Sequence, residues 1–512
     1  MLAKVDLDEI TIAELQARMA SGELTARQVV EAYLERIDAI DRRGPTLRSV
    51  IQTNPDALAI ADALDAERRG GRVRGPLHGI PILLKDNIDT ADRLQTTAGS
   101  LALVDVPVSQ DATVASQLRQ AGAVILGKAN LSEWANFRST RSSSGWSGRG
   151  RQTRNPYVLD RSPGGSSSGS AVAVSANLAV AALGTETDGS IMSPSAACGV
   201  VGIKPTVGLT SRAGVIPISH SQDSVGPHAR TVADAAIVLG ALVGVDPRDE
   251  ATQASSGKSF TDYTRFLDAD GLRGVRLGVA RKFHTGYSEH TDRVFEAALD
   301  VLRGCGAELV DEVEIPGHKA LQDPLPGGDL NAEGYVLQYE FKADVQAYLA
   351  TRPDAPVRTL ADLIRFNTQH ADQEMPYFGQ ERFTQSESRG PLTDEIYQRA
   401  LEHDRAFARG FEAVFRERGF DALVAPTNTP PWVIDLFNGD RVLGGSARVA
   451  AVSGCPLVTV PAGRVFDLLP VGLTFMGPAW SEPVLIRLAY AFEQARRGRQ
   501  PPRCVPTTLD LP

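Results

Sequence analysis

Short apolar runs alternate with helical patterns over most of the chain from about residue 79 onward. Several runs lack the in/out alternation of a half-exposed strand, which is typical of strands covered on both faces of a sheet. Because amphipathic stretches lie between them, the pattern indicates a layered α/β fold. The predicted strands are Ile80–Leu84, Ala123–Leu126, Leu178–Leu183, Val275–Val279, Leu423–Ala425, Leu457–Val460 and Val471–Phe475, and the predicted helices include Ala112–Ala121, Val232–Val243 and Thr291–Arg303.

The first 70 residues have a different, helical pattern. The segments Thr11–Glu14 and Thr25–Gln28 both have the S/T-x-x-E/Q form of a helix N-terminal capping box, and apolar residues at helical spacing follow the second. We expect two amphipathic helices here and a third over residues 56–68, all packed outside a larger body. Residues 1–512 are expected to form a single domain.

Residues 323–410 are more charged and more aromatic than their surroundings, and mostly helical in pattern. This predicts a helical insertion that lies over the sheet. It forms either one wall of a cleft, with Tyr377 and Phe378 as contact residues, or a solvated outer layer.

Composition limits the classes of partner. The chain has 512 residues, of which 42% are hydrophobic and 22% charged, as in ordinary globular proteins with a large core. Its net charge of -9 provides no basic field for nucleic acid or anionic lipid. No apolar run reaches the roughly 18 residues of a membrane helix, and the N-terminus lacks the apolar core of a signal peptide. We therefore expect a cytoplasmic protein with neither a nucleic-acid nor a membrane partner.

The cysteines and histidines give no sign of a metal site. Cys198, Cys305, Cys455 and Cys504 are far apart and form no CxxC pair, which is typical of buried apolar residues. The eight histidines show no ligand spacing. We expect neither a metal nor a cofactor.

The stretch 163–190, PGGSSSGSAVAVSANLAVAALGTETDGS, begins and ends with a glycine-serine turn. The residues between the turns are too apolar for a loop and predict a helix over about 168–176, followed by the strand Leu178–Leu183. Such a pair of elements brings both turns to one place. Reactive groups on loops held by a rigid scaffold are the usual construction of a catalytic site.

Short motifs in the chain match known catalytic patterns only in part. Gly165–Gly169 fits G-x-S-x-G and would make Ser167 a nucleophile, but poor strand material precedes it and the last histidine, His403, lacks an obvious acid partner. Ser255–Lys258 fits S-x-x-K within a polar, loop-like stretch. The segment around Lys258 resembles the end of a P-loop motif, but Thr252 stands where the first glycine of that motif should be.

A serine enzyme without a suitable histidine needs another base, and a lysine can serve when burial lowers its pKa toward neutrality. Lys85 closes the apolar run Gly79–Lys85. Its head group either reaches the surface or is buried for a reason. Strand alternation directs the next residue, Asp86, to the opposite face, so that it does not form an ion pair that would keep the amine charged.

Four segments together resemble the amidase signature family of serine hydrolases: GIPILLKDN (79–87), PGGSSSGSA (163–171), GTETDGSI (184–191) and GVVGIKPTVGL (199–209). Ser166 and Ser190 are 24 positions apart (190 minus 166), the separation that this family keeps between its catalytic serines. The resemblance extends from about Ile10 to Gln500. Residues 130–139, 144–157 and 221–235 look most like bacterial peptide amidases, which deamidate C-terminal peptide amides.

The resemblance implies a single α/β/α domain around a large mixed sheet, covered by helices on both faces. It also implies an amide hydrolase in which Ser190 is the nucleophile, Ser166 a bridging serine after a cis peptide, and Lys85 the base. Hydrolysis of aryl acylamides, carbamates (urethanes) or esters by the same triad is the alternative, and an amidotransferase subunit is a third interpretation. The oxyanion hole is expected from the backbone N–H groups of Thr187, Asp188, Gly189 and Ser190.

Several further residues are candidates for substrate contact. Asp188 stands where much of the family has glycine, and it either shapes the pocket and binds the leaving nitrogen or serves as a turn former. Trp134 and Trp146 either line the acyl pocket or fill the core. The expected substrate contacts are Trp134, Trp146, Asp188, Met192, Tyr377 and Phe378, with Asn136, Arg138 and Arg141 as weaker candidates, and His78, His220 and His228 as structural hydrogen-bonding residues.

Overall fold

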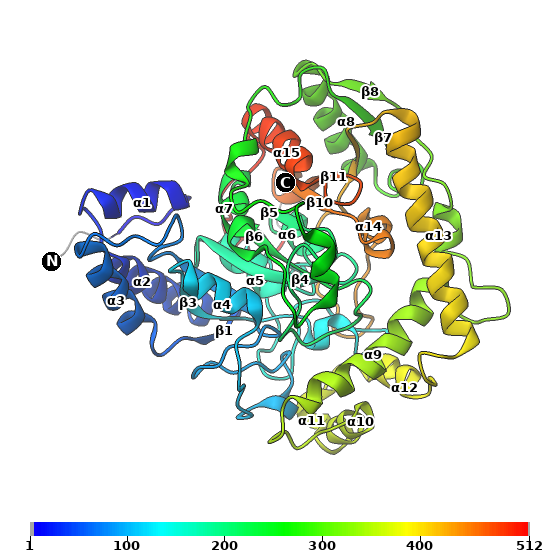
Figure 1. The fold of residues 1–512 in the computed structure, drawn as a ribbon, viewed down its shortest axis with the longest axis horizontal. Helices are drawn as coiled ribbons and strands as arrows, with labels where there is room; N and C mark the ends of the chain where they lie inside the picture. The colour runs from blue at the N-terminus through cyan, green and yellow to red at the C-terminus, as the bar shows by residue number, and fades with distance from the viewer. Residues whose placement is uncertain (1–4, 510–512) are drawn as a thin grey trace.

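A computed structural model describes residues 5–509 and is built on one mixed sheet, whose eleven strands follow the order β1-β3-β2-β4-β6-β5-β10-β11-β9-β7-β8 (Figure 1). β2 is parallel to β3 and β4, and β7 is parallel to β8 and β9, whereas the other neighbours pair antiparallel. The strands are β1 (Val50–Thr53), β2 (Pro81–Lys85), β3 (Val124–Ala129), β4 (Ala181–Glu186), β5 (Val201–Lys204), β6 (Ser224–Ala229), β7 (Arg276–Val279), β8 (Glu308–Val310), β9 (Ala422–Pro426), β10 (Leu457–Val465) and β11 (Leu469–Met476).

Helices cover both faces of this sheet. The helices α4, α7, α15 and α8 contact one another in that order over one face, while α5 and α6 contact each other over the other face. The helices are α1 (Ile12–Ala20), α2 (Ala26–Arg36), α3 (Ala57–Arg69), α4 (Thr113–Gln120), α5 (Ser168–Ser175), α6 (Met192–Ala197), α7 (Val232–Leu242), α8 (Glu289–Gly304), α9 (Ala332–Ala350), α10 (Leu360–Gln369), α11 (Ala371–Glu374), α12 (Glu381–Glu387), α13 (Glu395–Arg418), α14 (Ala447–Ser453) and α15 (Glu482–Arg496).

All seven predicted strands are present, as is the predicted helix that begins at Ser168. β4 begins three positions later than expected, at Ala181, and extends to Glu186, so that part of the second glycine-serine segment belongs to the strand. Sequence analysis missed β1, β5, β6 and β8. β1 and β8 are the short edge strands of the sheet, whose polar faces lack the buried apolar run.

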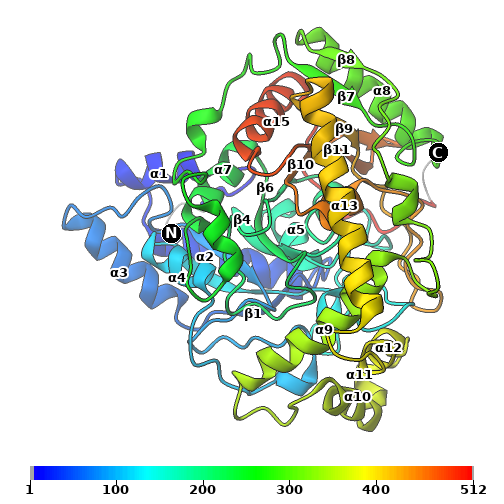
Figure 2. The same cartoon turned by 45° about the vertical axis from the view of Figure 1, so that its right-hand side comes forward.

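The N-terminal helices α1, α2 and α3 gather at one side of the molecule, and α9 to α13 lie at the opposite side (Figures 1 and 2). The predicted capping boxes at Thr11 and Thr25 are both formed. The last helix of the expected insertion, α13, continues to Arg418, past the predicted boundary at 410. Aromatic residues of α9 and α12 pack with Trp134 and Phe137, so these helices share a core with the segment before them.

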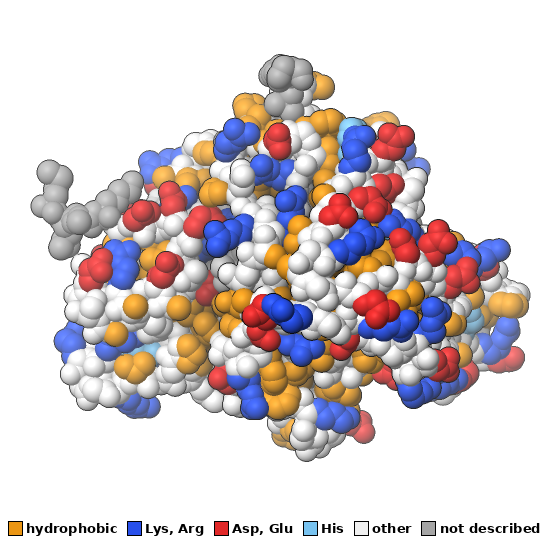
Figure 3. Space-filling model, turned by 90° about the horizontal axis from the view of Figure 1, so that it is seen from above, with side chains coloured by type: hydrophobic (Ala, Val, Ile, Leu, Met, Phe, Trp, Pro, Cys, Tyr) orange, Lys and Arg blue, Asp and Glu red, His pale blue; other side chains and the backbone are white. Residues whose placement is uncertain are grey.

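The face drawn in Figure 3 shows no purely basic field, as the net charge of the sequence predicts. On the face drawn in Figure 3, Lys and Arg side chains are interspersed with Asp and Glu side chains. Among residues 5–509, no helix combines the length and the apolar character that crossing a membrane requires. All four cysteines are free thiols; Cys198 and Cys455 are buried as expected, but Cys305 and Cys504 are only half-buried.

Candidate active site

Three side chains from separate segments form a continuous hydrogen-bonded chain. Lys85 ends β2, Ser166 precedes α5, and Ser190 lies in the turn between β4 and α6. The Lys85 Nζ lies 2.8 Å from the Ser166 Oγ, and the Ser166 Oγ lies 2.9 Å from the Ser190 Oγ. The Gly165–Ser166 peptide bond is cis, as the resemblance implies. Lys85 and Ser166 are fully buried, whereas Ser190 is 7% exposed and is therefore the member that a solute can reach.

The fold brings the two serine turns together because α5 packs tightly against neighbouring backbone. β2 and β4 are parallel neighbours, so their carboxyl ends meet at one edge of the sheet. The Ser167 N–H donates to the Ser190 carbonyl at 3.1 Å, and the Ser167 Oγ donates to the Thr185 carbonyl at 3.0 Å. In the first turn of α5, a Cβ on Gly169 would lie only 2.3 Å from the Ser49 carbonyl oxygen, so this close approach requires glycine.

Burial makes Lys85 far easier to deprotonate than an ordinary lysine. Burial lowers the pKa of Lys85 from 10.5 to about 7, against the opposing pull of the Asp223 and Glu186 carboxylates. Its Nζ also contacts the Thr185 Oγ1 at 2.8 Å and the Thr185 carbonyl at 3.2 Å. As expected from strand alternation, Asp86 lies on the other side of the strand, where it forms an ion pair with Arg149 at 3.2 Å.

The turn Thr187–Ser190 presents four consecutive backbone N–H groups that donate to no acceptor within residues 5–509. Two buried carboxylates fix its ends. The Glu186 carboxylate accepts from the N–H groups of Ile191 and Met192 at 2.6 and 2.8 Å. Asp223 accepts from the Thr187 hydroxyl. Gly189 has a φ of +78°, a left-handed conformation that glycine adopts without strain. A fixed turn with free donors is the arrangement that stabilises an oxyanion.

Two adjoining cavities open over this turn. The Ser190 cavity, of about 420 Å³, is lined by Thr187, Asp188 and Ser190. The Met192 cavity, of about 630 Å³, is lined by Gly189 and Met192. The residues that line both cavities are Asn136, Thr140, Gly165, Asp188, Arg382 and Arg448. The two cavities therefore form one cleft that meets at the reactive turn.

Known proteins resemble this chain over most of its length. The amidase family model matches residues 28–486, which is most of the chain. The chain belongs to the amidase family. It is 44% identical over 505 residues to a probable amidase of Arabidopsis thaliana, covering 98% of this chain and 92% of that protein. It is 36% identical to a glutamyl-tRNA(Gln) amidotransferase subunit of Chloroflexus aurantiacus, with 98% and 99% of the two chains covered.

Among solved structures, a native peptide amidase from Stenotrophomonas maltophilia superposes with a TM-score of 0.91 at 52% identity, covering 97% of this chain and 99% of the other. The large mixed sheet with its helices is thus the amidase signature fold that the sequence predicts. The protein is an amide hydrolase of this family, and it is structurally close to peptide amidases.

The charged lining of the amidase cleft was not predicted, apart from Asp188. Arg448, at the start of α14, lies 3.0 Å from Glu333 and 3.5 Å from Asp188, so one guanidinium bridges two carboxylates. Burial and the nearby Asp188 carboxylate raise the pKa of Glu333 to about 7. The Arg382 guanidinium forms no ion pair within residues 5–509. These residues come from α9, α12 and α14, and no sequence pattern connects them.

Only some of the predicted substrate contacts line the cleft. Met192 and Asp188 line the cleft as expected. The four aromatic residues lie outside the lining of both cavities, so Trp134 and Trp146 follow the alternative in which they fill the core, and the substrate contacts expected of Tyr377 and Phe378 stay a prediction. Trp134 is buried against Phe383 in an edge-to-face pair. Trp146 is buried against Phe378 and the half-exposed Tyr377, with ring centroids 5.1 and 6.0 Å away.

Of the weaker candidates, Asn136 lines both cavities, whereas Arg138 is buried in an ion pair with Glu133 at 3.1 Å. Ser167, the serine of the G-x-S-x-G match, is fully buried and hydrogen-bonded to Thr185. It therefore has no access to a substrate. Ser255 is likewise buried and donates to the Thr252 carbonyl at 2.7 Å.

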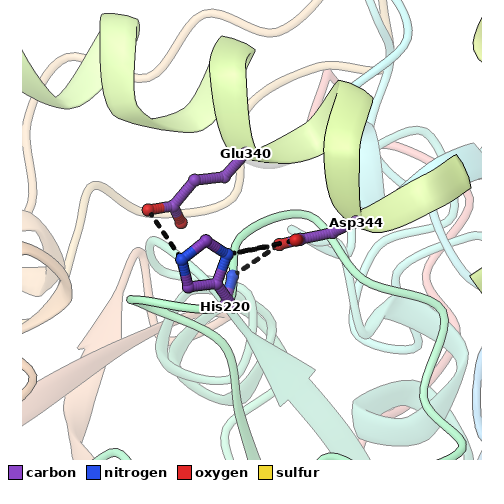
Figure 4. Close-up of side chains that lie close together, drawn as sticks. All are labelled: His220, Glu340 and Asp344. Atoms are coloured by element: carbon purple, nitrogen blue, oxygen red, sulfur yellow. Dashed lines mark hydrogen bonds and ion pairs between the residues drawn. The ribbon is translucent and has the colours of Figure 1, made fainter. Parts of the chain in front are cut away.

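The expected structural histidines are hydrogen-bonded. His78 contacts the Leu64 carbonyl at 3.0 Å, and His228 contacts the Ser195 hydroxyl at 2.8 Å. His220 lies between two carboxylates of α9, with its Nδ1 2.9 Å from Asp344 and its Nε2 3.4 Å from Glu340 (Figure 4). Sequence spacing did not reveal this grouping. It joins α9 to the loop that precedes Asp223, and thus supports the reactive turn from outside.

Proposed function

We propose that this amidase hydrolyses the C-terminal primary amides of peptides, or similar acyl amides, and releases ammonia. The observation that carries the proposal is the chain from Lys85 through Ser166 to Ser190 beneath a turn of free N–H groups. The likeness to a peptide amidase at 52% identity supports the choice of substrate.

The hydrogen bonds around Lys85 support its role as the base. A neutral amine has two hydrogens and one lone pair. The Thr185 carbonyl can only accept, and it lies 3.2 Å from the Nζ, while the Thr185 Oγ1 lies 2.8 Å away. With both hydrogens directed to Thr185, the lone pair faces the Ser166 Oγ at 2.8 Å. Ser166 can then donate to Lys85 and accept from Ser190, because hydroxyl hydrogens rotate freely.

In the proposed reaction, the Ser190 Oγ attacks the amide carbonyl carbon and its proton passes to Ser166, whose own proton passes to Lys85. The developing oxyanion accepts hydrogen bonds from the N–H groups of the turn Thr187–Ser190, each worth about 10²–10³ in rate in comparable enzymes. The relay then returns a proton to the leaving nitrogen as the C–N bond breaks, which releases ammonia. Water attacks the acyl-enzyme along the same route and regenerates Ser190.

A panel of acyl compounds with one common acyl group tests the proposal. We expect ammonia release from an N-acetyl dipeptide amide, with Ser190→Ala as the inactive control. Release of aniline or alcohol from the matched anilide, carbamate or ester, without ammonia from the amide, would instead support the alternative hydrolase. Amide turnover that appears only with a partner protein would support an amidotransferase subunit, which the relatives of that class keep open.

A further inference from the structure

Exposed apolar side chains are concentrated in one segment between β9 and α14. Val433, Phe437, Val442 and Leu443 are 50%, 87%, 51% and 66% exposed, and they are four of the nine large apolar side chains exposed among residues 5–509. Val442 and Leu443 line the Met192 cavity. We call Val433–Leu443 the apolar rim. Grouped apolar side chains at the surface usually mark a place where something binds.

The apolar rim is fixed in place rather than loosely attached. The Ile434 N–H donates to the Asp160 carbonyl at 2.9 Å. The Asp440 carboxylate accepts from the Ser144 N–H at 3.1 Å and from the Trp432 Nε1–H at 2.9 Å. Gly439 approaches the Arg141 carbonyl so closely that a Cβ would lie 2.6 Å from the oxygen. These contacts hold the backbone of the rim beside the cleft.

The position of the rim identifies the part of a substrate that it meets. The Met192 cavity is also lined by Gly189 and Met192, which lie one and two positions from Ser190 in the chain. In the proposed reaction the leaving group is ammonia, which needs almost no space. The cavity of about 630 Å³ is therefore available to the acyl part of the substrate. An acyl chain that extends from Ser190 into this cavity enters a space lined by Met192, Val442 and Leu443.

We propose that Val442 and Leu443 form a subsite for an apolar side chain of the peptide residue that precedes the amidated residue, with Phe437 extending the contact outward. This inference rests on the proposed function and adds a preference to it. Burying an apolar side chain against the rim removes both surfaces from water, which favours apolar over polar peptides. A polar side chain at the same place gains no comparable contact.

The test compares two substrates that differ only at that residue, N-acetyl-Leu-Ala amide and N-acetyl-Ser-Ala amide, with ammonia release as the readout. We expect wild-type kcat/KM to favour the leucyl substrate by about 10-fold, the lower range for one apolar group in a pocket. Leu443→Ser and Val442→Ser should each lower kcat/KM for the leucyl substrate by about 3- to 10-fold, mainly through KM. Both variants should leave the seryl substrate almost unchanged.

Val245→Ser is the matched control, because Val245 is 47% exposed and lies outside the lining of both cavities. It should behave as wild type on both substrates. Equal losses on the two substrates, or no loss on the leucyl one, would overturn the subsite while leaving the proposed function intact. If wild type releases ammonia from neither peptide, the proposed function fails, and the subsite fails with it.

Discussion

Replacing Lys85 with methionine should abolish turnover and make the protein more stable. A pKa of about 7 in place of 10.5 means that burying this amine costs the folded state about 5 kcal/mol at neutral pH. Methionine fills a similar volume without that cost. It loses three hydrogen bonds worth about 1 kcal/mol each. The two Thr185 oxygens keep other donors, because Ser167 and Asn87 contact them at 3.0 Å. We therefore expect Lys85→Met to raise the free energy of unfolding by about 2 kcal/mol at pH 7.

The pH dependence makes this prediction specific. Between the folded pKa of about 7 and the ordinary value of 10.5, the unfolded lysine keeps a proton that the folded one has lost. The unfolded state thus binds more protons, so wild-type stability rises with pH in this window. The advantage of Lys85→Met is largest at pH 7 and below, and should shrink by about 1.4 kcal/mol per pH unit above it.

Urea unfolding at pH 7 and pH 9, together with ammonia release from a peptide amide, measures both effects. Wild-type kcat/KM should rise about tenfold per pH unit below 7 and level off above it, because only the neutral amine accepts a proton. Lys128→Met is the matched control. Burial lowers the pKa of Lys128 to about 8, and its Nζ contacts the Thr96 Oγ1 at 2.8 Å rather than the serines. This variant should keep its turnover.

Three results would refute the reasoning. Wild-type turnover in Lys85→Met would exclude this lysine as the base. A Lys85→Met protein that is less stable than wild type at pH 7, by an amount that does not change with pH, would show that the amine is charged in the folded state. A rate that does not change from pH 5 to 10 would also exclude a base whose pKa is near 7.

The remaining predictions concern the nucleophile, the cleft and the outer support. Ser190→Ala should release no ammonia, and Ser166→Ala should keep only about 10⁻³ of the wild-type rate or less, because it interrupts the relay. Arg448→Ala should lower kcat about tenfold, because it leaves the Asp188 carboxylate uncompensated beside the oxyanion donors; Asp188→Asn in the same protein should restore most of the rate. His220→Gln should lower the thermal unfolding temperature more at pH 5.5 than at pH 8.5. The Asp344 hydrogen bond raises the pKa of His220, so its stabilising effect is present below pH 6.5 and is lost as the pH rises through the folded pKa.

Seven strands could be predicted because each is a short apolar run, whereas the buried strands β5 and β6 were missed, and β6 shows why. Its sequence, SVGPHA, contains Gly226 and Pro227, which are poor strand residues. The structure tolerates both. A Cβ on Gly226 would lie 1.9 Å from the Ile203 carbonyl oxygen, so the two backbones can approach only with glycine there. β5 pairs with β6 only at His228 and Ala229, so the ladder between these strands ends before the proline.

The candidate site likewise contains residues that the sequence predicts and residues that it does not. Lys85, Ser166 and Ser190 each lie in a short stretch of sequence whose residue pattern is informative on its own. Arg448 and Glu333 do not, because α14 and α9 come to the reactive turn only through the tertiary fold. The sequence could not decide between the pocket and the core for Trp134 and Trp146 for a related reason. Proximity in sequence to a reactive segment does not determine whether a ring faces a cavity or packs behind its wall.

The position of the acids around Lys85 explains how one site can hold both a neutral amine and several carboxylates. The adjacent Asp86 is directed across the strand to Arg149, and neither Asp223 nor Glu186 forms an ion pair with the amine in the described part of the chain. Asp223 instead accepts from the Thr187 hydroxyl in the turn. Glu186 accepts from the N–H of Ile191, directly after the turn. Their Coulomb attraction offsets part of the desolvation, and the remaining effect leaves the pKa near 7. The same carboxylates therefore hold the turn of the proposed oxyanion donors and affect the pKa of Lys85, which links the geometry of the turn to the pH at which the proposed relay would operate.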